Sequence, residues 1–372
     1  MTNLIIPIAG YSSRFPNLNP KWSLTHPRGR MMVVEAISGL DLSDVSSIYV
    51  IGLTEHDRTF QLTSALAPQF EALGLGDRTN FVLLDERTSS QPESIARGIR
   101  QANIRGSIYI KDSDNFFRDK PMDMNAVAGF DLHRLERVNA RSKSYFETND
   151  DGIIVNIVEK RIVSSQFCVG GYSFQDADEF LTYYDRYSSE PDDLYVSTII
   201  FGMILDGFAF SHVEVDDYED WGTLKEWRSY TSQYSTLFVD LDGVIVLNSA
   251  QFSDPKWGTT EGITENIEVL NRLHQTGKVH IVITTARSEA FRDITSQQLS
   301  RLGVQYDSII FGLPHGKRIV VNDYAPSNPF KSCDSINIRR NSTDLKEMLE
   351  DSIGTHIDAS LVSNVITTPA IE

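Results

Sequence analysis

The sequence predicts an α/β protein with two doubly wound, Rossmann-like domains. Short apolar runs alternate with amphipathic stretches, a pattern typical of parallel sheets flanked by helices. The polar segment 229–235 interrupts this alternation once, and a new apolar run follows it at once. The length of 372 residues accommodates two domains of ordinary size. We therefore expect domains over 1–231 and 232–354, followed by a tail without periodicity over 355–372.

The expected strands are apolar runs bounded by polar or glycine-containing segments. In the first domain they are 4–8, 48–51, 81–84, 108–110, 153–158 and 199–201, and in the second 237–239, 280–283, 309–311 and 319–321. Helices are expected between many of them, where apolar residues repeat at helical spacing: Ile95, Ile99 and Ala102, and again Ile263, Ile267 and Leu270.

The composition excludes several classes of function. A net charge of −17 argues against binding to nucleic acid or to anionic membranes, since both attract basic surfaces. The net charge does not exclude anionic substrates, because a few cationic groups can reverse the negative electrostatic potential inside a cleft. Cys168 and Cys333 are the two cysteines, which predicts neither a disulfide framework nor a zinc site. Without a signal-peptide pattern over 1–10 or a long apolar run, a cytoplasmic protein is expected.

A small-residue turn follows the first expected strand. Its backbone N–H groups lie where they can hold phosphate oxygens, and the residues concerned are Ala9, Gly10, Ser12 and Ser13. Arg14 and Lys21 would add positive charge for a triphosphate and for a pyrophosphate leaving group. Taken alone, an ordinary turn with a surface arginine and lysine is an equal alternative.

The turn resembles the signature of the sugar-nucleotide and alcohol-phosphate nucleotidyltransferases, or pyrophosphorylases. In that family an Ala-Gly turn, an arginine and a Pro-Lys pair recur in this order, although Tyr11, Ser12 and Ser13 stand here where more glycine is usual. The resemblance covers about residues 3–228 and implies the nucleotidyltransferase fold. It implies transfer from an NTP, with CTP or UTP favoured, to a sugar- or polyol-phosphate, giving an NDP-linked product and pyrophosphate.

Later segments follow the family's order and imply further site residues. The helix start at 89–94 resembles the stretch that reads the base, through Gln91 and Ser94. Asp114, with Asp112 as second choice, and Asp220 of an Asp-x-Gly-Thr-like stretch resemble the family's ligands for Mg²⁺, which prefers carboxylates and substrate phosphates. The residues that resemble sugar-side contacts are Glu159, Lys160 and Gly171. Surface capping is the alternative for the aspartates, and a solvated edge for the Glu-Lys pair.

The second domain opens with an apolar strand followed by Asp240 and Asp242. One aspartate can attack phosphorus while the other delivers a proton to the leaving oxygen, and Gly243 lets the chain turn tightly. This pattern resembles the first motif of the haloacid dehalogenase-like phosphatases, here without room for a large cap. The residues that resemble the later motifs are Thr285, with Arg287 as a substrate contact, Lys317 and Asp323.

The resemblances together imply a bifunctional enzyme with one Mg²⁺ in each domain. In the second domain the ion would be held by Asp240 and Asp323, with Asp242 in the same acidic group. Such a fusion favours a place in activated-sugar or surface-polysaccharide precursor synthesis. Two alternatives remain open at this point: a single catalytic domain beside a binding or dimerising module, and a nucleotide-sensing regulator without turnover.

Overall fold

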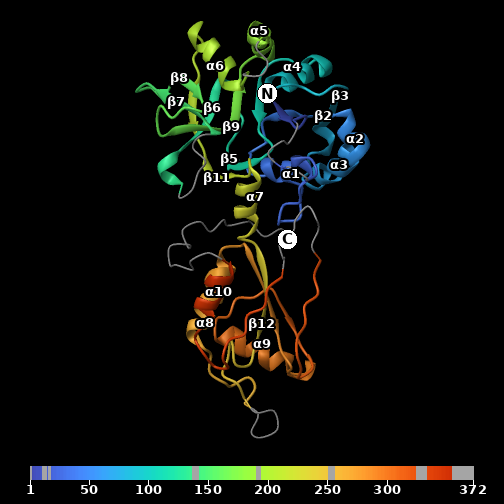
Figure 1. The fold of residues 1–372 in the computed structure, drawn as a ribbon, viewed down its shortest axis with the longest axis vertical. Helices are drawn as coiled ribbons and strands as arrows, with labels where there is room; N and C mark the ends of the chain where they lie inside the picture. Colours follow the sequence, from blue (N-terminus) through green and yellow to red (C-terminus); the bar gives the residue numbers. More distant parts are fainter. Residues whose placement is uncertain are drawn as a thin grey trace. The chain divides into compact units, whose positions relative to one another are not determined.

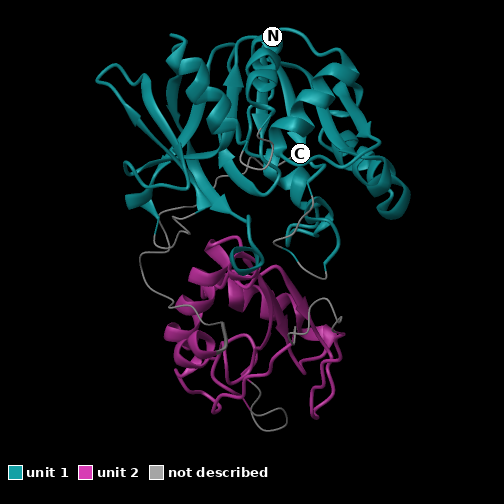
Figure 2. Cartoon of the chain, turned by 45° about the horizontal axis from the view of Figure 1, so that its top comes forward, with its two compact units in different colours: residues 1–227 teal, residues 228–372 magenta. Residues whose placement is uncertain are grey.

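The computed structural model describes residues 2–10, 15, 18–135, 142–189, 194–249, 256–323 and 333–353. The chain forms two compact units, which we call unit 1 (residues 1–227) and unit 2 (228–372) (Figure 2). The expected domain boundary at 231 lies a few residues beyond this division. The expected tail over 355–372 lies outside the described residues.

Unit 1 is built on a mixed nine-stranded sheet (Figure 1). Its main path runs β10 (Ser211–Glu214), β6 (Ala126–Asp131), β9 (Gln166–Phe174), β4 (Ile108–Lys111), β1 (Thr2–Pro7), β2 (Val45–Leu53) and β3 (Thr79–Leu84). β7 (Ser144–Thr148) pairs with β9 and with β8 (Ile154–Glu159). The strands from β4 to β3 are parallel, whereas β9 is antiparallel to β4 and β6. The first sheet is therefore mixed rather than purely parallel.

Helices cover both faces of this sheet. Successive residues of β1 point to opposite faces, so that Ile5 packs in one core and Leu4 and Ile6 in the other. The core around Ile5 is closed by α4 (Gln91–Ala102), α5 (Ala177–Tyr187) and α6 (Val196–Leu205). The other core is closed by α1 (Met32–Ile37) and α3 (Leu62–Ala72), while α2 (Thr54–Phe60) follows β2. The short 3-10 helices of this unit are Lys21–Ser23, Gly76–Arg78 and Leu132–Arg134.

A separate antiparallel ribbon joins β5 (Asn115–Arg118) to β11 (Asp216–Asp220). The strand expected at 199–201 is wrong, because these residues belong to helix α6. Ile199 and Ile200 are buried against the sheet, and a short apolar run cannot by itself distinguish a buried helix from a strand. Helix α7 (Leu224–Thr231) follows the ribbon.

Unit 2 contains a three-stranded parallel sheet in the order β12 (Ser235–Asp240), β13 (Val279–Thr284) and β14 (Ser308–Ile310). Its helices are α8 (Thr264–Gln275), α9 (Arg292–Arg301) and α10 (Leu345–Ile353), with a 3-10 turn at Glu289–Phe291. The strand expected at 319–321 is wrong: these residues form no regular element, and Val321 is 91% exposed. No helix among the described residues of either unit is long and apolar enough to cross a membrane.

Candidate functional site

The ribbon brings Asp114 and Asp220 together at the end of β4. Asp220 is the register partner of Asn115, and the backbone N–H of Trp221 donates to the carbonyl of Asp114 at 2.9 Å. The two aspartates are more than a hundred residues apart in sequence, so that their proximity depends on β11 returning to β5. The backbones of the two aspartates therefore lie side by side, and their shared role as metal ligands stays a prediction.

Each of the two carboxylates is paired with a lysine. Lys21 Nζ lies 2.5 Å from Asp114 Oδ2 and also donates to the carbonyl of Gly222 at 3.3 Å. Lys143, at the entrance to β7, is ion-paired with Asp220 and donates to the hydroxyl of Tyr218 at 2.6 Å. All four charged side chains are largely buried, between 13% and 17% exposed. Lys143 was not predicted, because it belongs to no recognisable motif.

The donor chemistry of this site fits Mg²⁺ once a phosphate is present. Proteins commonly contribute one or two carboxylates to a magnesium site, while substrate phosphates and water supply the other oxygen ligands. Within the described ranges, no group of three or more His, Cys, Asp or Glu side chains is arranged to hold a metal ion. A magnesium ion held by Asp114 and Asp220 would therefore need further oxygen ligands from outside the protein side chains.

Asp112, the second predicted ligand, is partly buried beside Gln91. The amide Nε2 of Gln91 donates to its Oδ1 at 2.5 Å, so that this predicted base reader contacts protein instead. Burial, followed by the charge of Asp114, raises the pKa of Asp112 to about 6. Gly170 makes room for this carboxylate, since it has φ +86° and a Cβ there would lie 2.3 Å from Asp112 Oδ2.

A buried lysine holds the turn that carries these aspartates. The side chain of Lys111 is fully buried, and its ammonium donates to the carbonyls of Asp112 at 2.8 Å and Asn115 at 3.0 Å. Its third bond is to the side-chain oxygen of Asn115. Burial lowers the pKa of Lys111 to about 7, opposed by the neighbouring carboxylates. Lys111 thereby fixes both ends of the segment 112–115.

The remaining predicted residues of unit 1 have different surroundings. Ala9 lines a cavity, Gly10 is exposed in the turn, and Ser12, Ser13 and Arg14 lie outside the described residues.

Ser94 is buried against Thr88 at 2.6 Å, and Ser90 caps the helix in its place. Glu159 accepts from Ser144 and Ser197, and Lys160 donates to Tyr195. Gly171 is packed where a Cβ would meet Tyr109 and Ala128.

A fully buried histidine, His26, packs against Trp221, the residue that follows Asp220. Its ring lies 5.1 Å from that of Trp221, and its Nδ1 accepts the backbone N–H of Arg28 at 3.2 Å. Glu35, also buried, accepts from Arg28 at 3.0 Å and from Arg30 at 3.4 Å. Burial lowers the pKa of His26 to about 4; Glu35 opposes this and the two arginines reinforce it. The turn 26–30 is therefore built around a neutral imidazole.

This histidine is expected to make unit 1 less stable in mild acid. The folded-state pKa of about 4 lies below the ordinary 6.5, so the unfolded chain binds the proton more tightly. The contribution of His26 to the free energy of unfolding is fully present above pH 6.5 and falls as the pH drops toward 4, by up to about 3 kcal/mol. We expect urea unfolding followed by tryptophan fluorescence to show this slope, and a His26→Gln variant to lose much of it. The exposed-residue control His133→Gln should retain it; equal slopes in all three proteins would contradict the assignment.

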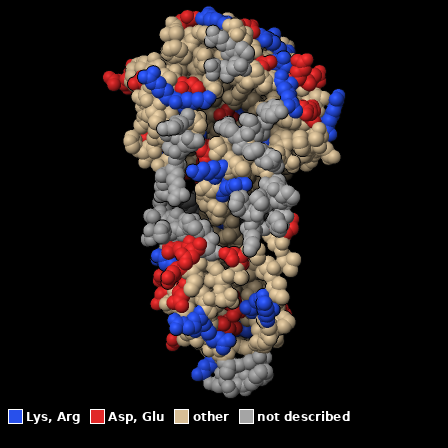
Figure 3. Space-filling model, in the orientation of Figure 1, with Lys and Arg blue, Asp and Glu red and all other residues tan. Residues whose placement is uncertain are grey.

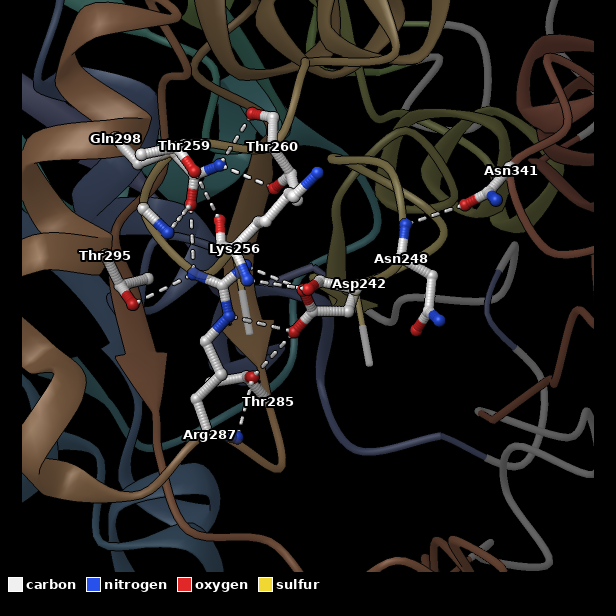
Figure 4. Close-up of polar contacts among 12 residues, drawn as sticks. Asp242, Asn248, Lys256, Thr259, Thr260, Thr285, Arg287, Thr295, Gln298 and Asn341 are labelled. Carbon is white, nitrogen blue, oxygen red and sulfur yellow. Dashed lines mark hydrogen bonds and ion pairs between the residues drawn. The ribbon is translucent and has the colours of Figure 1, made fainter. Parts of the chain in front are cut away.

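In unit 2, a buried arginine clamps Asp242 (Figure 4). Arg287 donates through Nη2 to Asp242 Oδ1 at 2.6 Å and through Nε to Oδ2 at 3.0 Å. Its Nη1 donates to Thr295 at 3.0 Å and Gln298 at 2.9 Å, and Thr285 reaches Asp242 at 3.4 Å. Arg287 therefore contacts Asp242, rather than standing open for a substrate.

Asp240 stands at the end of β12 with Arg318 beside it. The guanidinium lies 3.0 Å from Asp240 Oδ1, and burial raises the pKa of Asp240 while Arg318 opposes the rise. Lys317 and Asp323 are exposed in the irregular segment 311–323. Asp240 and Asp242 are thus both paired with arginines, and the magnesium site predicted for this unit stays a prediction.

Charged side chains are mixed over the surface. On the face drawn in Figure 3, the Lys and Arg side chains of the described residues form small groups interspersed with Asp and Glu. This face of the described part carries no continuous basic surface of the kind that nucleic acid requires.

Comparison with known proteins reports on the fold. No family model and no curated protein matches the sequence. Among solved structures, the chain is similar to the nucleoside-diphosphate-sugar pyrophosphorylase from Vibrio cholerae RC9, with 18% identity and a TM-score of 0.52 over 61% of this chain and 98% of that one. It is similar to a putative glucose-1-phosphate thymidylyltransferase from Bacillus anthracis, with 18% identity and a TM-score of 0.50 over 61% and 93%. About three fifths of the chain therefore has the mixed α/β fold of the nucleotidyltransferases.

Proposed function

We propose that unit 1 transfers a nucleotidyl group from an NTP to the phosphate of a sugar- or polyol-phosphate. An oxygen of the acceptor phosphate attacks the α-phosphorus, the bond to the β-phosphate oxygen breaks, and pyrophosphate leaves. The observation that carries this proposal is the convergence of two carboxylates and two lysines, Asp114 with Lys21 and Asp220 with Lys143. No protein nucleophile is needed, since such transfers depend on positioning and charge neutralisation.

In this proposal the two carboxylates and the two ammonium groups have different roles. Asp114 and Asp220 would hold Mg²⁺, which would neutralise phosphate charge and polarise the phosphorus centre. Lys21 and Lys143 would then exchange their carboxylate partners for phosphate oxygens, which would offset part of the negative charge that a triphosphate brings into the site. When pyrophosphate and the product leave the site, both lysines would pair with the aspartates again.

The test is pyrophosphate release by the full chain. Each NTP is supplied with Mg²⁺ and a panel of sugar- and polyol-phosphates, and pyrophosphate is measured with a coupled assay. Turnover that needs both substrates supports the proposal. Binding of NTP without turnover across the panel would instead favour a nucleotide sensor.

A second activity is proposed for unit 2, phosphomonoester hydrolysis through Asp240. The parallel pairing of Asp240 with Thr284 brings this carboxylate and the neighbouring Thr285 to one edge of the sheet. Arg318, which pairs with Asp240, would exchange that carboxylate for a phosphate. We expect Asp240→Asn to abolish hydrolysis of p-nitrophenyl phosphate without changing pyrophosphate release. Wild-type protein that hydrolyses no phosphomonoester would leave unit 2 as a binding or dimerising module.

A further inference from the structure

Lys143 has two kinds of partner in unit 1, a carboxylate and aromatic side chains. Its ammonium is ion-paired with Asp220, and it donates to the hydroxyl of Tyr218 at 2.6 Å. The same ammonium lies 5.3 Å from the centre of the Tyr218 ring and 5.9 Å from that of Phe167. The faces of aromatic rings attract cations at such distances. Tyr218 and Phe167 therefore hold the lysine independently of Asp220.

The ring of Tyr218 is itself fixed by its neighbours. It is 7% exposed, and its centre lies 5.4 Å from that of Phe167 and 5.7 Å from that of Phe130. The residue belongs to strand β11, two positions before Asp220. A tyrosine side chain has few torsions, whereas a lysine has a long flexible stem that loses much conformational freedom when it is ordered. Tyr218 thus offers a fixed hydroxyl to a flexible lysine.

Lys143 adjoins the residues that are predicted to contact the acceptor. Its backbone carbonyl accepts the N–H of Lys160 at 2.9 Å, and the next residue, Ser144, donates to Glu159. Glu159 and Lys160 are the predicted sugar-side residues. Lys21, in contrast, follows the turn after β1 that is predicted to hold the triphosphate. Of the two lysines in the site, we therefore assign Lys143 to the acceptor phosphate.

We propose, on the basis of the nucleotidyl transfer proposed above, that Tyr218 is a positioning residue that holds Lys143 for the acceptor phosphate. Once Asp220 holds a magnesium ion, its carboxylate is engaged elsewhere, and a lysine with no other partner would lose its place. The hydroxyl of Tyr218 keeps the ammonium in the site, with help from the two rings. Tyr218 would act on the reaction through Lys143 alone.

The experiment uses Tyr218→Phe in the full chain, which removes the hydroxyl and keeps the ring. Pyrophosphate release gives kcat and the KM for the sugar- or polyol-phosphate that supports turnover. We expect this KM to rise about tenfold, because the ammonium loses a hydrogen bond that fixes it. The acceptor phosphate is charged before it reacts, so the loss falls on binding and kcat should change by less than about twofold.

A binding measurement without turnover separates the acceptor from the nucleotide. Isothermal titration calorimetry gives the dissociation constant of the same NTP with Mg²⁺ in the absence of acceptor. We expect Tyr218→Phe to change this constant by less than about twofold, since Lys21 and the turn after β1 are untouched.

A double-mutant cycle distinguishes positioning from a structural role. In a Lys143→Met background, Tyr218→Phe should change the acceptor KM by less than about twofold, because the lysine through which it acts is gone. Tyr183→Phe is the matched control. Tyr183 is 5% exposed, its hydroxyl donates to Asp206 at 2.7 Å, and its replacement should leave kcat and the acceptor KM as in the wild type.

An unchanged acceptor KM in Tyr218→Phe, or an equal rise with and without Lys143, would overturn the positioning role and leave nucleotidyl transfer standing. Weaker binding of the NTP in Tyr218→Phe would overturn the assignment of Lys143 to the acceptor. Wild-type protein that releases no pyrophosphate would overturn the proposed transfer itself, and this inference with it.

Discussion

Replacing Asp220 by asparagine is expected to slow pyrophosphate release by about 10²–10³-fold. Asparagine preserves the size of the side chain and the bond that Asp220 Oδ1 accepts from the N–H of Gly222 at 2.9 Å. It removes the negative charge on which Lys143 and a bound Mg²⁺ both depend. The loss should appear in kcat with saturating substrates, and raising the Mg²⁺ concentration should restore part of it.

Asp217 provides the control on the same strand. It lies three residues before Asp220, pairs with Arg118 at 2.6 Å and has an exposed side chain. Its φ of +56° is a backbone conformation that asparagine adopts readily. Asp217→Asn should therefore change the rate by less than about twofold. Comparable losses in both variants would show that the strand, and not the carboxylate of Asp220, is what the reaction needs.

Replacing Lys111 by methionine is expected to destabilise unit 1 by about 3–5 kcal/mol. Methionine fills similar space but leaves the carbonyls of Asp112 and Asn115 without their buried donor. It also removes the cation 4.2 Å from the centre of the Phe117 ring. Urea unfolding measures the stability change, and the pyrophosphate assay should show a loss of activity even at temperatures where the variant is folded.

Lys120 is the matched lysine for this comparison. It is half exposed near the end of β5 and pairs with Asp44 at 2.7 Å. Surface ion pairs contribute about 1 kcal/mol or less, so Lys120→Met should leave both stability and activity close to the wild type. A Lys111→Met protein as stable as the Lys120→Met protein would contradict the role given to the buried ammonium.

Most parallel strands of the fold could be predicted, because each is a short apolar run between polar segments. β9 could not be predicted, because Gly170 and Gly171 interrupt the apolar run within it. The structure explains both: Gly170 leaves room for Asp112, and Gly171 for Tyr109. Residues 199–201 were misassigned because helix α6 is apolar on nearly all sides, which hides its period.

Residues of the candidate site that belong to a motif could be predicted from the sequence. Residues that reach the site only through tertiary pairing could not. Asp114 lies just after β4, Asp220 is the last residue of β11, and both have neighbours that belong to a recognisable motif. Lys143 reaches Asp220 only because the chain folds back through β7, and nothing in its local sequence indicates this. Arg287 was assigned to substrate for a similar reason, since its ion pair with Asp242 joins residues 45 apart in the chain.

The ribbon between β5 and β11 has a consequence for protein synthesis. A ribosome delivers the chain from its N-terminus, so β5 emerges about a hundred residues before the strand that pairs with it. Until β11 has left the exit tunnel, the nascent polypeptide carries Lys21 and Asp114 without Asp220. The proposed active site of unit 1 would therefore be completed late in its translation, shortly before the first residues of unit 2 are synthesised.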